Sequence, residues 1–306
     1  KDSVGKSFFD VTRVGPVVLS YVPTNIVPKD LMRQSGITLS VSDGLVAFTV
    51  PSDTVVVLGD IKTGTVLGTR DIPAAKGVLV LSHDSLLVST SGVVKRFALK
   101  WTAGKPMLGA GTVVLSGFED PRTLQTDPKH SRLYVADGGK SNQIKGYDPK
   151  TYKRLLVIGQ PGGPQVGVYN ELQMQCPNGL AIDDVGQLWV AEADWMPKRI
   201  SVWDTATGAL KRSHYGPPHY GGGGTLDPSD KTRLFHGEFS CTIEFKLDWK
   251  TGTAKLVAIP VRQEVQKIGY TMELGYGPEV PWHVNGRTYL SLGYQTAHRS
   301  NNSNGL

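Results

Sequence analysis

The chain has 306 residues, with 36 glycines, 19 prolines and 39% hydrophobic residues, which is typical of a turn-rich all-β protein of one large or two ordinary domains. It contains no run of 18 apolar residues, and two cysteines are too few for a disulfide scaffold or a cysteine zinc cluster. The net charge of +6 is scattered along the chain rather than gathered in a basic stripe, which argues against a nucleic acid as partner.

The N-terminal region, residues 1–35, stands apart from the rest. Residues 1–7 are polar, whereas 8–14 and 16–22 have the apolar, β-branched character of strands. We expect these strands either to close a ring formed by the rest of the chain or to link it to another domain. Because the chain begins at Lys1 without an apolar leader, we expect a processed protein or a domain of a longer one.

From residue 36 onward, short apolar runs alternate with tight turns. Two successive sets of four strands are predicted here, at 37–41, 45–50, 54–58 and 65–70, and then at 77–81, 85–89, 93–99 and 112–115. Several of the runs are joined by turns that contain glycine, such as 60–64, and two runs joined in this way predict a hairpin. No segment of three helical turns stands out.

The stretch 176–204 shows the repeating unit most clearly. It holds three β-branched or aromatic runs, at 180–182, 188–191 and 199–203, which are too short for helices. Related units lie on both sides, so that Leu133, Leu188 and Leu234 stand 55 and 46 residues apart. Four-stranded units repeated at roughly this spacing predict the blades of a β-propeller.

Two motifs in these units resemble a known family. Leu-Tyr-Val-Ala-Asp at 133–137, followed by Ile-Lys-Gly-Tyr-Asp at 144–148, resembles the NHL repeat. Pro-Asn-Gly-Leu-Ala-Ile-Asp at 177–183, with Leu-Trp-Val-Ala-Glu at 188–192, is similar to that repeat and to the gluconolactonase-like propellers. The resemblance covers residues 118–260 and implies a propeller fold, but a fold does not settle an activity.

A sixth blade opens near Tyr270 and includes the apolar run 287–292, after which 297–306 is an Asn- and Ser-rich polar tail. The predicted fold is therefore an all-β, six-bladed β-propeller of four-stranded antiparallel blades, NHL-like over residues 36–296. The last blade is short of strands. Either the N-terminal strands complete it, or the chain is part of a longer protein, because an open blade would leave an unpaired sheet edge.

In a propeller the ends of the second strands and the starts of the inner strands meet on one face, and loops on such a rigid scaffold commonly carry binding groups. We expect the following residues to bind a ligand there: Asp137, Asn178, Glu192, Asp194, Trp195, Tyr220 and Glu238. Asp137, Glu192 and Glu238 hold equivalent positions in their units. They either form a carboxylate ring around a ligand or Ca²⁺, or they cap amides of their own loops. The connections before inner strands add Tyr169, His214 and His219.

The resemblance to gluconolactonase-like propellers implies that Asn178, in Pro-Asn-Gly, is a ligand of Ca²⁺ or another divalent metal. Such an ion needs several oxygen ligands. The family's partner residues are missing, because the next unit has Gly-Gly-Gly at 222–224 and the preceding one has Pro121-Arg122. The alternative is that Asn178 bonds the backbone of its own turn. The metal-dependent lactonase interpretation is thus incomplete, and no cofactor is assigned.

A second catalytic hypothesis uses the loop 214–220, which precedes a glycine run. His219 or Tyr220 could take a proton next to a substrate carboxylate neutralised by Arg122, as in polysaccharide lyases. The alternative is a glycine-rich connection whose rings serve no chemistry. Cys176 and Cys241 are expected at the same end of adjacent blades, where a disulfide is conceivable and would favour an extracytoplasmic location.

The interpretation that these observations favour is a non-catalytic ligand-binding propeller module of a secreted or multidomain protein. Its ligand would be a polysaccharide or a protein, bound on the face built from Arg122, Asn178, Glu192, Trp195 and the loop 214–224. The alternative is an enzyme with its site at the central opening, either a metal-dependent lactonase or hydrolase or a polysaccharide lyase.

Overall fold

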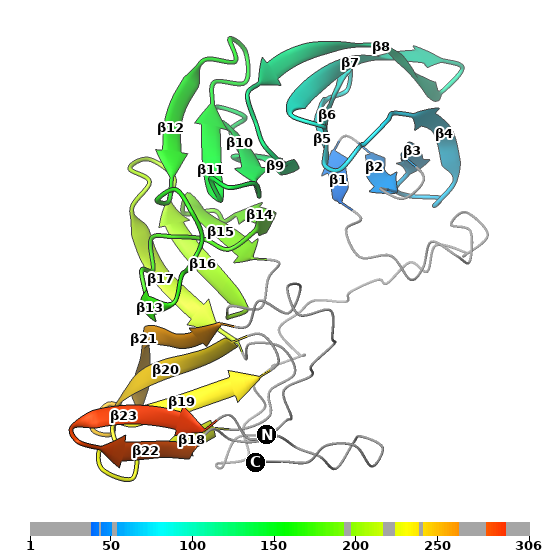
Figure 1. Ribbon diagram of the computed structural model, residues 1–306. Coiled ribbons are helices and arrows are strands. Elements are labelled where there is room, and N and C mark those ends of the chain that lie inside the picture. Colours follow the sequence, from blue (N-terminus) through cyan, green and yellow to red (C-terminus); the bar gives the residue numbers. More distant parts are fainter. Residues whose placement is uncertain are drawn as a thin grey trace, which may run out of the picture.

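The computed structural model describes residues 38–42, 44–50, 54–192, 197–216, 224–238, 241–262 and 280–291. Every regular element among them is a β-strand, and no helix in these ranges is long and apolar enough to cross a membrane. The strands form antiparallel sheets in which, with one exception, each strand pairs with a neighbour along the chain. Figure 1 shows these sheets following one another along an arc.

The first three sheets are named blades 1 to 3. Blade 1 contains β1 (Leu39–Ser42), β2 (Leu45–Val50), β3 (Val55–Asp60) and β4 (Val66–Asp71). Blade 2 contains β5 (Val78–Ser82), β6 (Ser85–Thr90), β7 (Val93–Thr102) and β8 (Lys105–Ser116). Blade 3 contains β9 (Pro121–Thr126), β10 (Leu133–Asp137), β11 (Gln143–Tyr147) and β12 (Arg154–Ile158).

The remaining strands form blades 4 and 5 and a hairpin. Blade 4 contains β14 (Pro177–Ile182), β15 (Gln187–Glu192), β16 (Arg199–Asp204) and β17 (Leu210–Tyr215). Blade 5 contains β18 (Gly224–Leu226), β19 (Arg233–Glu238), β20 (Cys241–Asp248) and β21 (Thr253–Arg262), joined by β13 (Gly167–Val168). The hairpin contains β22 (Val280–Val284) and β23 (Arg287–Ser291).

Three clusters of apolar side chains join neighbouring blades. Leu58 of blade 1 packs with Phe97 of blade 2, and Leu87 of blade 2 packs in a second cluster with Leu133 of blade 3. A third cluster joins blades 3 and 4 around Trp203, which is fully buried. The inner strands β1, β5, β9 and β14 lie side by side. Four-stranded sheets that pack face to face with their first strands together form a β-propeller, so the predicted fold class is confirmed.

The turns between third and fourth strands follow one pattern in blades 1, 3, 4 and 5. An aspartate lies at the end of the third strand or directly after it, and its Oδ1 accepts amide hydrogens from residues two and three positions later. The residue four positions after the aspartate has a positive φ, which favours glycine. These residues are Gly64, Tyr152, Gly208 and Gly252. Tyr152, with φ of 58°, is the exception in blade 3.

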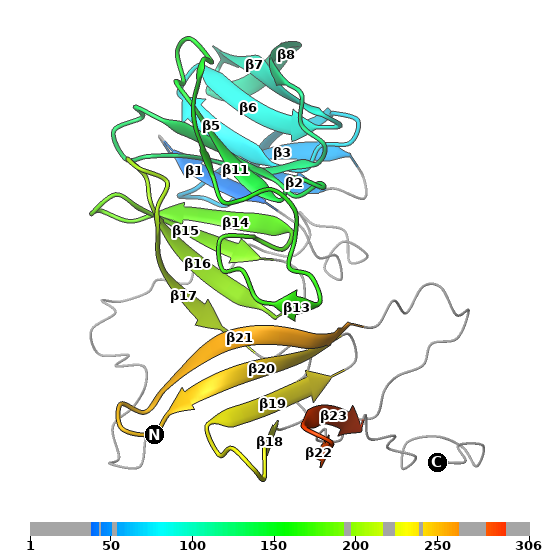
Figure 2. The same cartoon turned by 60° about the vertical axis from the view of Figure 1, so that its left-hand side comes forward.

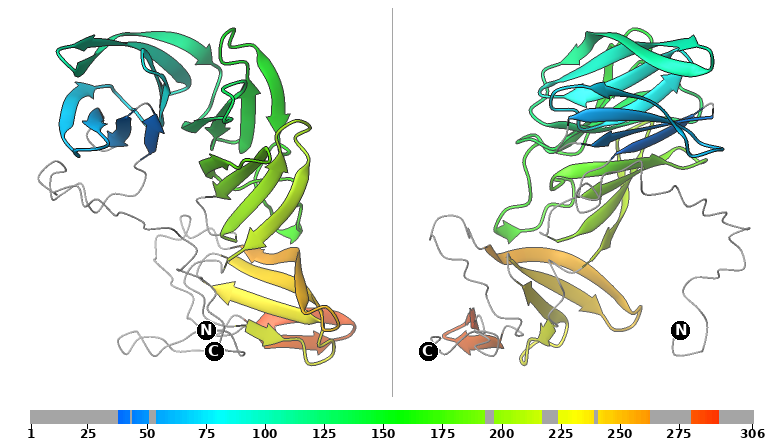
Figure 3. Two further views of the ribbon diagram at one scale, coloured as in Figure 1. Left: turned by 180° about the vertical axis from the view of Figure 1, so that it is seen from behind. Right: turned by 90° about the vertical axis from the view of Figure 1, so that its right-hand side faces the viewer.

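The described blades leave the arc open between blade 1 and the hairpin (Figure 3). The predicted strands at 8–14 and 16–22, the polar tail and the start of the sixth blade near Tyr270 lie outside the described residues. Closure into six blades therefore stays a prediction. The hairpin β22–β23 confirms strand structure over most of 287–292.

One strand departs from the simple order of a propeller. The connection between β12 and β14 contains β13, which pairs with the outer strand β21 of blade 5 (Figure 2). Tyr169, which follows β13, is buried with Ile243 and Leu256 of blade 5. Tyr169 thus lies in a connection before an inner strand, as expected. Its side chain nevertheless packs against blade 5, because the connection between blades 3 and 4 adds a strand to blade 5.

Candidate functional site

The ends of the second strands bring the predicted carboxylates to equivalent places. Asp137 stands opposite Pro121 in blade 3, and Glu192 stands opposite Pro177 in blade 4. The strand register shifts immediately after each proline, so Arg122 and Asn178 lie at corresponding irregularities. The sequence alignment of these units is thus confirmed residue by residue for blades 3 and 4.

Asp137 is a buried carboxylate whose partners are all within blade 3. Its oxygens accept hydrogen bonds from the amides of Asp120 and Glu119, at 2.8 and 3.2 Å for Oδ1, and lie 2.6 Å from the ammonium of Lys145. Burial opposes ionisation, but Lys145 and the two amides outweigh it and hold the pKa of Asp137 below its usual value. Its side chain is 0% exposed, so it fixes the chain before β9 instead of facing a ligand.

Glu192 is buried in the corresponding place of blade 4. Its Oε2 accepts the amide hydrogen of Gln175 at 2.8 Å, and its Oε1 lies 3.2 Å from the guanidinium of Arg199 and 3.2 Å from the hydroxyl of Ser201. Burial raises the pKa of Glu192 to about 7, against the opposing influence of Arg199 and the Gln175 amide. This carboxyl therefore changes its charge near neutral pH.

Arg199 connects blade 4 to the segment that carries β13. Its guanidinium donates to the carbonyl oxygens of Gln173, at 3.0 Å, and Glu171, and to the hydroxyl of Ser213. Its side chain is 0% exposed. All these contacts anchor the chain. In both blades the amides that the carboxylate caps precede the inner strand, which corrects the expectation that they belong to its own loop.

Arg122 is held beside blade 3 by an ion pair. Its Nε donates to Asp120 Oδ2 at 2.7 Å, and the other oxygen of Asp120 pairs with Lys76 of blade 2. Burial opposes ionisation of Asp120, but hydrogen bonds from Lys76 and Arg122 lower its pKa overall. This cluster joins blades 2 and 3. A role for Arg122 in neutralising a substrate stays a prediction.

Asn178 lies half-buried at the irregularity of β14. Within the described ranges, no group of three or more His, Cys, Asp or Glu side chains is placed to hold a metal ion. The Ca²⁺ ligand set implied by the family resemblance is therefore not assembled from such side chains in the described part of the chain. The role of Asn178 stays a prediction.

Four of the predicted site residues lie outside the described residues: Asp194, Trp195, His219 and Tyr220. The backbone of Glu238 ends β19 opposite Cys241, at the position that the repeat predicts, whereas its side chain is not described. His214 belongs to strand β17 and not to a connection, so its predicted place in a loop is wrong.

The structure places a cavity at the ends of the outer strands of blade 4. Its volume is about 370 Å³, and it is lined by Ala191, Glu192, Lys198, Arg199, Ile200, His214, Tyr215 and Gly216. The lining combines apolar, aromatic and cationic residues, which is typical of sites for organic ligands. The sequence had indicated the neighbouring loop 214–224 as part of the binding face, but not this strand-end cavity.

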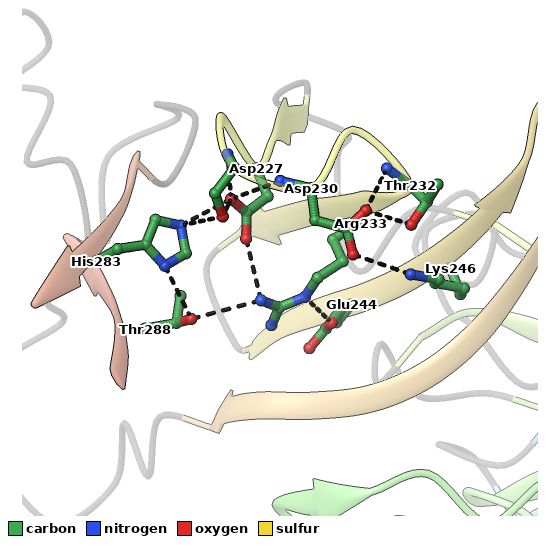
Figure 4. A network of polar contacts seen from close by, with 9 residues as sticks. Asp227, Asp230, Thr232, Arg233, Glu244, Lys246, His283 and Thr288 are labelled. Carbon is green, nitrogen blue, oxygen red and sulfur yellow. Dashed lines mark hydrogen bonds and ion pairs between the residues drawn. The ribbon is translucent and has the colours of Figure 1, made fainter. Parts of the chain in front are cut away.

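A polar network that the sequence did not reveal joins blade 5 to the hairpin (Figure 4). Asp227 is fully buried and accepts hydrogen bonds from His283 Nε2, at 2.7 Å, Ser229 and Arg233. Burial opposes ionisation of Asp227, but Ser229 and His283 lower its pKa to about 2. His283 lies 56 residues from Asp227, so no local motif could have indicated the pair.

The two cysteines are not joined to each other. Cys176 precedes β14 and Cys241 begins β20 in the next blade, and the structure contains no disulfide between them. The conceivable bridge is thus not formed, although the two residues do belong to adjacent blades as expected.

No protein-family model and no curated protein matches the sequence. Among solved structures, the chain is similar to the nidogen/laminin complex, with 17% identity and a TM-score of 0.45 over 72% of this chain and 79% of that one. It is also similar to the hydrazine synthase of Kuenenia stuttgartiensis, with 14% identity and a TM-score of 0.45 over 78% of this chain and 69% of that one. A third similar structure is a Bacteroides uniformis protein provisionally described as a 6-phosphogluconolactonase. The identity is 12% and the TM-score 0.43, over 74% of this chain and 72% of that one. At these values the likenesses carry no argument about a ligand or an activity.

Proposed function

We propose that this chain is a non-catalytic, NHL-like propeller module that binds a polysaccharide or a protein and belongs to a secreted or multidomain protein. The observation that carries the proposal is how the two described carboxylates of the predicted site are used. Asp137 is bonded to Lys145 and two amides, and Glu192 to Arg199, an amide and a hydroxyl. Carboxylates occupied in this way hold the scaffold and are poorly placed to act as metal ligands.

The cavity of blade 4 is the place where we expect the ligand. Ile200, whose side chain is exposed at 44%, and Ala191 supply an apolar wall, while Lys198 and His214 supply polar groups that can orient a ligand. A rigid sheet holds these residues, so little ordering entropy is lost when a ligand binds.

The proposal is tested by screening the purified chain against a glycan array and a peptide array. We expect saturable binding in one array, and we expect Ile200→Asp to weaken it at least tenfold. The matched control is Ile61→Asp, because Ile61 is also exposed at 44% but belongs to blade 1. Binding that both substitutions weaken equally, or the absence of binding to either array, would overturn the proposal.

An enzyme is the second candidate, and one observation favours it. Glu192 lines the cavity and its pKa of about 7 suits a general acid or base at neutral pH. In a polysaccharide lyase this carboxylate would take the proton next to a substrate carboxyl group. Ultraviolet absorbance of unsaturated products from polyuronates, and hydrolysis assays with lactones, test this candidate. Turnover abolished by Glu192→Gln in a variant that stays folded would replace the binding proposal.

Metal dependence is a separate question for the lactonase variant of this candidate. Elemental mass spectrometry of chelator-free protein compares the wild type with Asn178→Ala. A stoichiometric divalent metal that disappears in Asn178→Ala would support a metal-dependent lactonase. A metal content that is the same in both proteins would remove Asn178 as a ligand.

A further inference from the structure

One face of blade 4 carries an aromatic and cationic surface beside the cavity. Trp189 of β15 stands opposite Val202 of β16, which in turn stands opposite Arg212 of β17. One row further along, Ala191, Ile200 and His214 are aligned in the same way. Alternation along the strands places both rows on the same face of the sheet. We call Trp189, Arg212 and His214 the blade 4 platform.

The three side chains of the platform are stacked. The indole of Trp189 and the imidazole of His214 are parallel to within 2°, with ring centroids 6.0 Å apart. The guanidinium carbon of Arg212 lies 4.9 Å from the centroid of the indole. The platform therefore combines two parallel rings with a cation that lies over the indole.

Polar contacts hold the platform in this arrangement before any ligand arrives. The indole N–H of Trp189 donates to Asp183 Oδ2 at 2.9 Å, and Arg212 donates to Gln187 Oε1 at 2.8 Å. Trp189 stands opposite Val202, which is fully buried. Side chains fixed in this way lose little entropy on binding. Arg212 and His214 are nevertheless exposed, so they are accessible to a ligand.

The platform continues into the cavity of blade 4, because His214 belongs to both and Ile200, which stands opposite His214, also lines the cavity. Lys198 adds a second cation at the cavity. The nearby carboxylates are engaged: Asp183 accepts hydrogen bonds from Trp189 and from the amides of Val185 and Gln187, and Glu192 is buried. Among the described residues, the platform thus combines two aromatic rings with the exposed cation of Arg212.

We propose that the blade 4 platform and its cavity bind an acidic saccharide, a polymer that contains uronate residues. The apolar face of a sugar ring would stack on Trp189 and His214, and its carboxylate would pair with Arg212. The parallel rings favour a saccharide over an acidic peptide, because a pyranose offers a flat C–H face of matching shape. This inference rests on the proposed binding function and specifies its ligand.

The test is calorimetric titration of the full chain with an oligogalacturonate. The methyl-esterified form of the same oligosaccharide keeps the stacking face but lacks the charge, so we expect it to bind at least tenfold more weakly. Dextran sulfate and polyglutamate replace the uronate by sulfate and by a peptide. We expect both to bind more weakly than the oligogalacturonate at equal ionic strength.

Three variants locate the site. Trp189→Ala and Arg212→Gln should each weaken binding of the oligogalacturonate about tenfold or more. The control is Trp101→Ala, because Trp101 forms a second stack, on His83 in blade 2, with centroids 4.7 Å apart. Near-ultraviolet circular dichroism shows whether each variant is folded. If Trp189→Ala is not folded, Arg212→Gln still tests the site.

The outcomes separate this inference from the proposed function. Equal binding of the charged and esterified oligosaccharides, or stronger binding of polyglutamate or dextran sulfate, would overturn the uronate specificity while a binding module remained. A Trp101→Ala variant that binds the oligogalacturonate as weakly as Trp189→Ala would overturn the location of the site on blade 4. No binding of any oligogalacturonate would overturn the inference, whereas the array screens decide the proposed function independently.

Discussion

Replacing Glu192 with glutamine is expected to remove a pH dependence from the stability of the fold. In the folded chain burial raises the pKa of this carboxyl from 4.5 to about 7. Between these values the folded state holds a proton that the unfolded state has released. The free energy of unfolding should therefore fall as the pH rises from about 4.5 to about 7 and should stay low above it.

The size of the effect follows from the same shift. One pKa unit corresponds to about 1.4 kcal/mol, so ionising Glu192 inside the fold costs roughly 3 kcal/mol. Glutamine cannot ionise. The difference in unfolding free energy between the wild type and Glu192→Gln should therefore change by about this amount between acid and alkaline pH, in the direction that favours the variant at high pH.

The assay is urea unfolding of both proteins at a series of pH values, followed by tryptophan fluorescence. Asp137→Asn is the matched control, because Asp137 holds the same position in blade 3 but its pKa is lowered. The stabilisation that ionised Asp137 provides should be present above the ordinary pKa of 3.8 and should be lost as the pH falls below it. This pH dependence of stability is opposite to that of Glu192. A difference between wild type and Glu192→Gln that stays constant from pH 5 to pH 9 would refute the reasoning.

Three further substitutions probe the scaffold, each measured by chemical unfolding. Tyr169→Ala should lower the free energy of unfolding by about 3–5 kcal/mol, because it removes a ring from the buried cluster that holds β13 on blade 5. Val168→Ala, at a residue that is 90% exposed, should change it by no more than about 0.5 kcal/mol. Equal losses in the two variants would contradict the packing. Gly252→Ala should cost about 1–2 kcal/mol from backbone strain alone, since φ is 69° and no heavy atom lies within 4 Å of the added carbon; a neutral result would mean that the turn changes its shape. His283→Ala should lower the free energy of unfolding by about 1–3 kcal/mol and expose the hairpin to proteolysis, because it removes a partner of the buried Asp227. Arg287→Ala, at the hairpin surface, should have neither effect.

Local pattern determined most of the strands of this protein. The predicted run 45–50 coincides with β2, and the runs 85–89 and 199–203 cover all but the last residue of β6 and β16. These strands could be predicted because alternation, β-branched residues and turn residues act over a few neighbouring positions. The equivalence of Asp137 and Glu192 followed from the same local repeat, since a repeated unit places its residues in repeated positions.

Tertiary structure decided what those residues do. The strand β13 was missed because only two residues pair, and their partner β21 lies about ninety positions away. The carboxylates were expected to face a ligand or their own loops, but their partners Lys145 and Arg199 and the amides before the inner strands are chosen by folding. The blade 4 platform needs three strands in register before Trp189 meets Arg212 and His214. Such pairings depend on which distant segments the packed blades bring together, whereas each strand depends mainly on its own few residues.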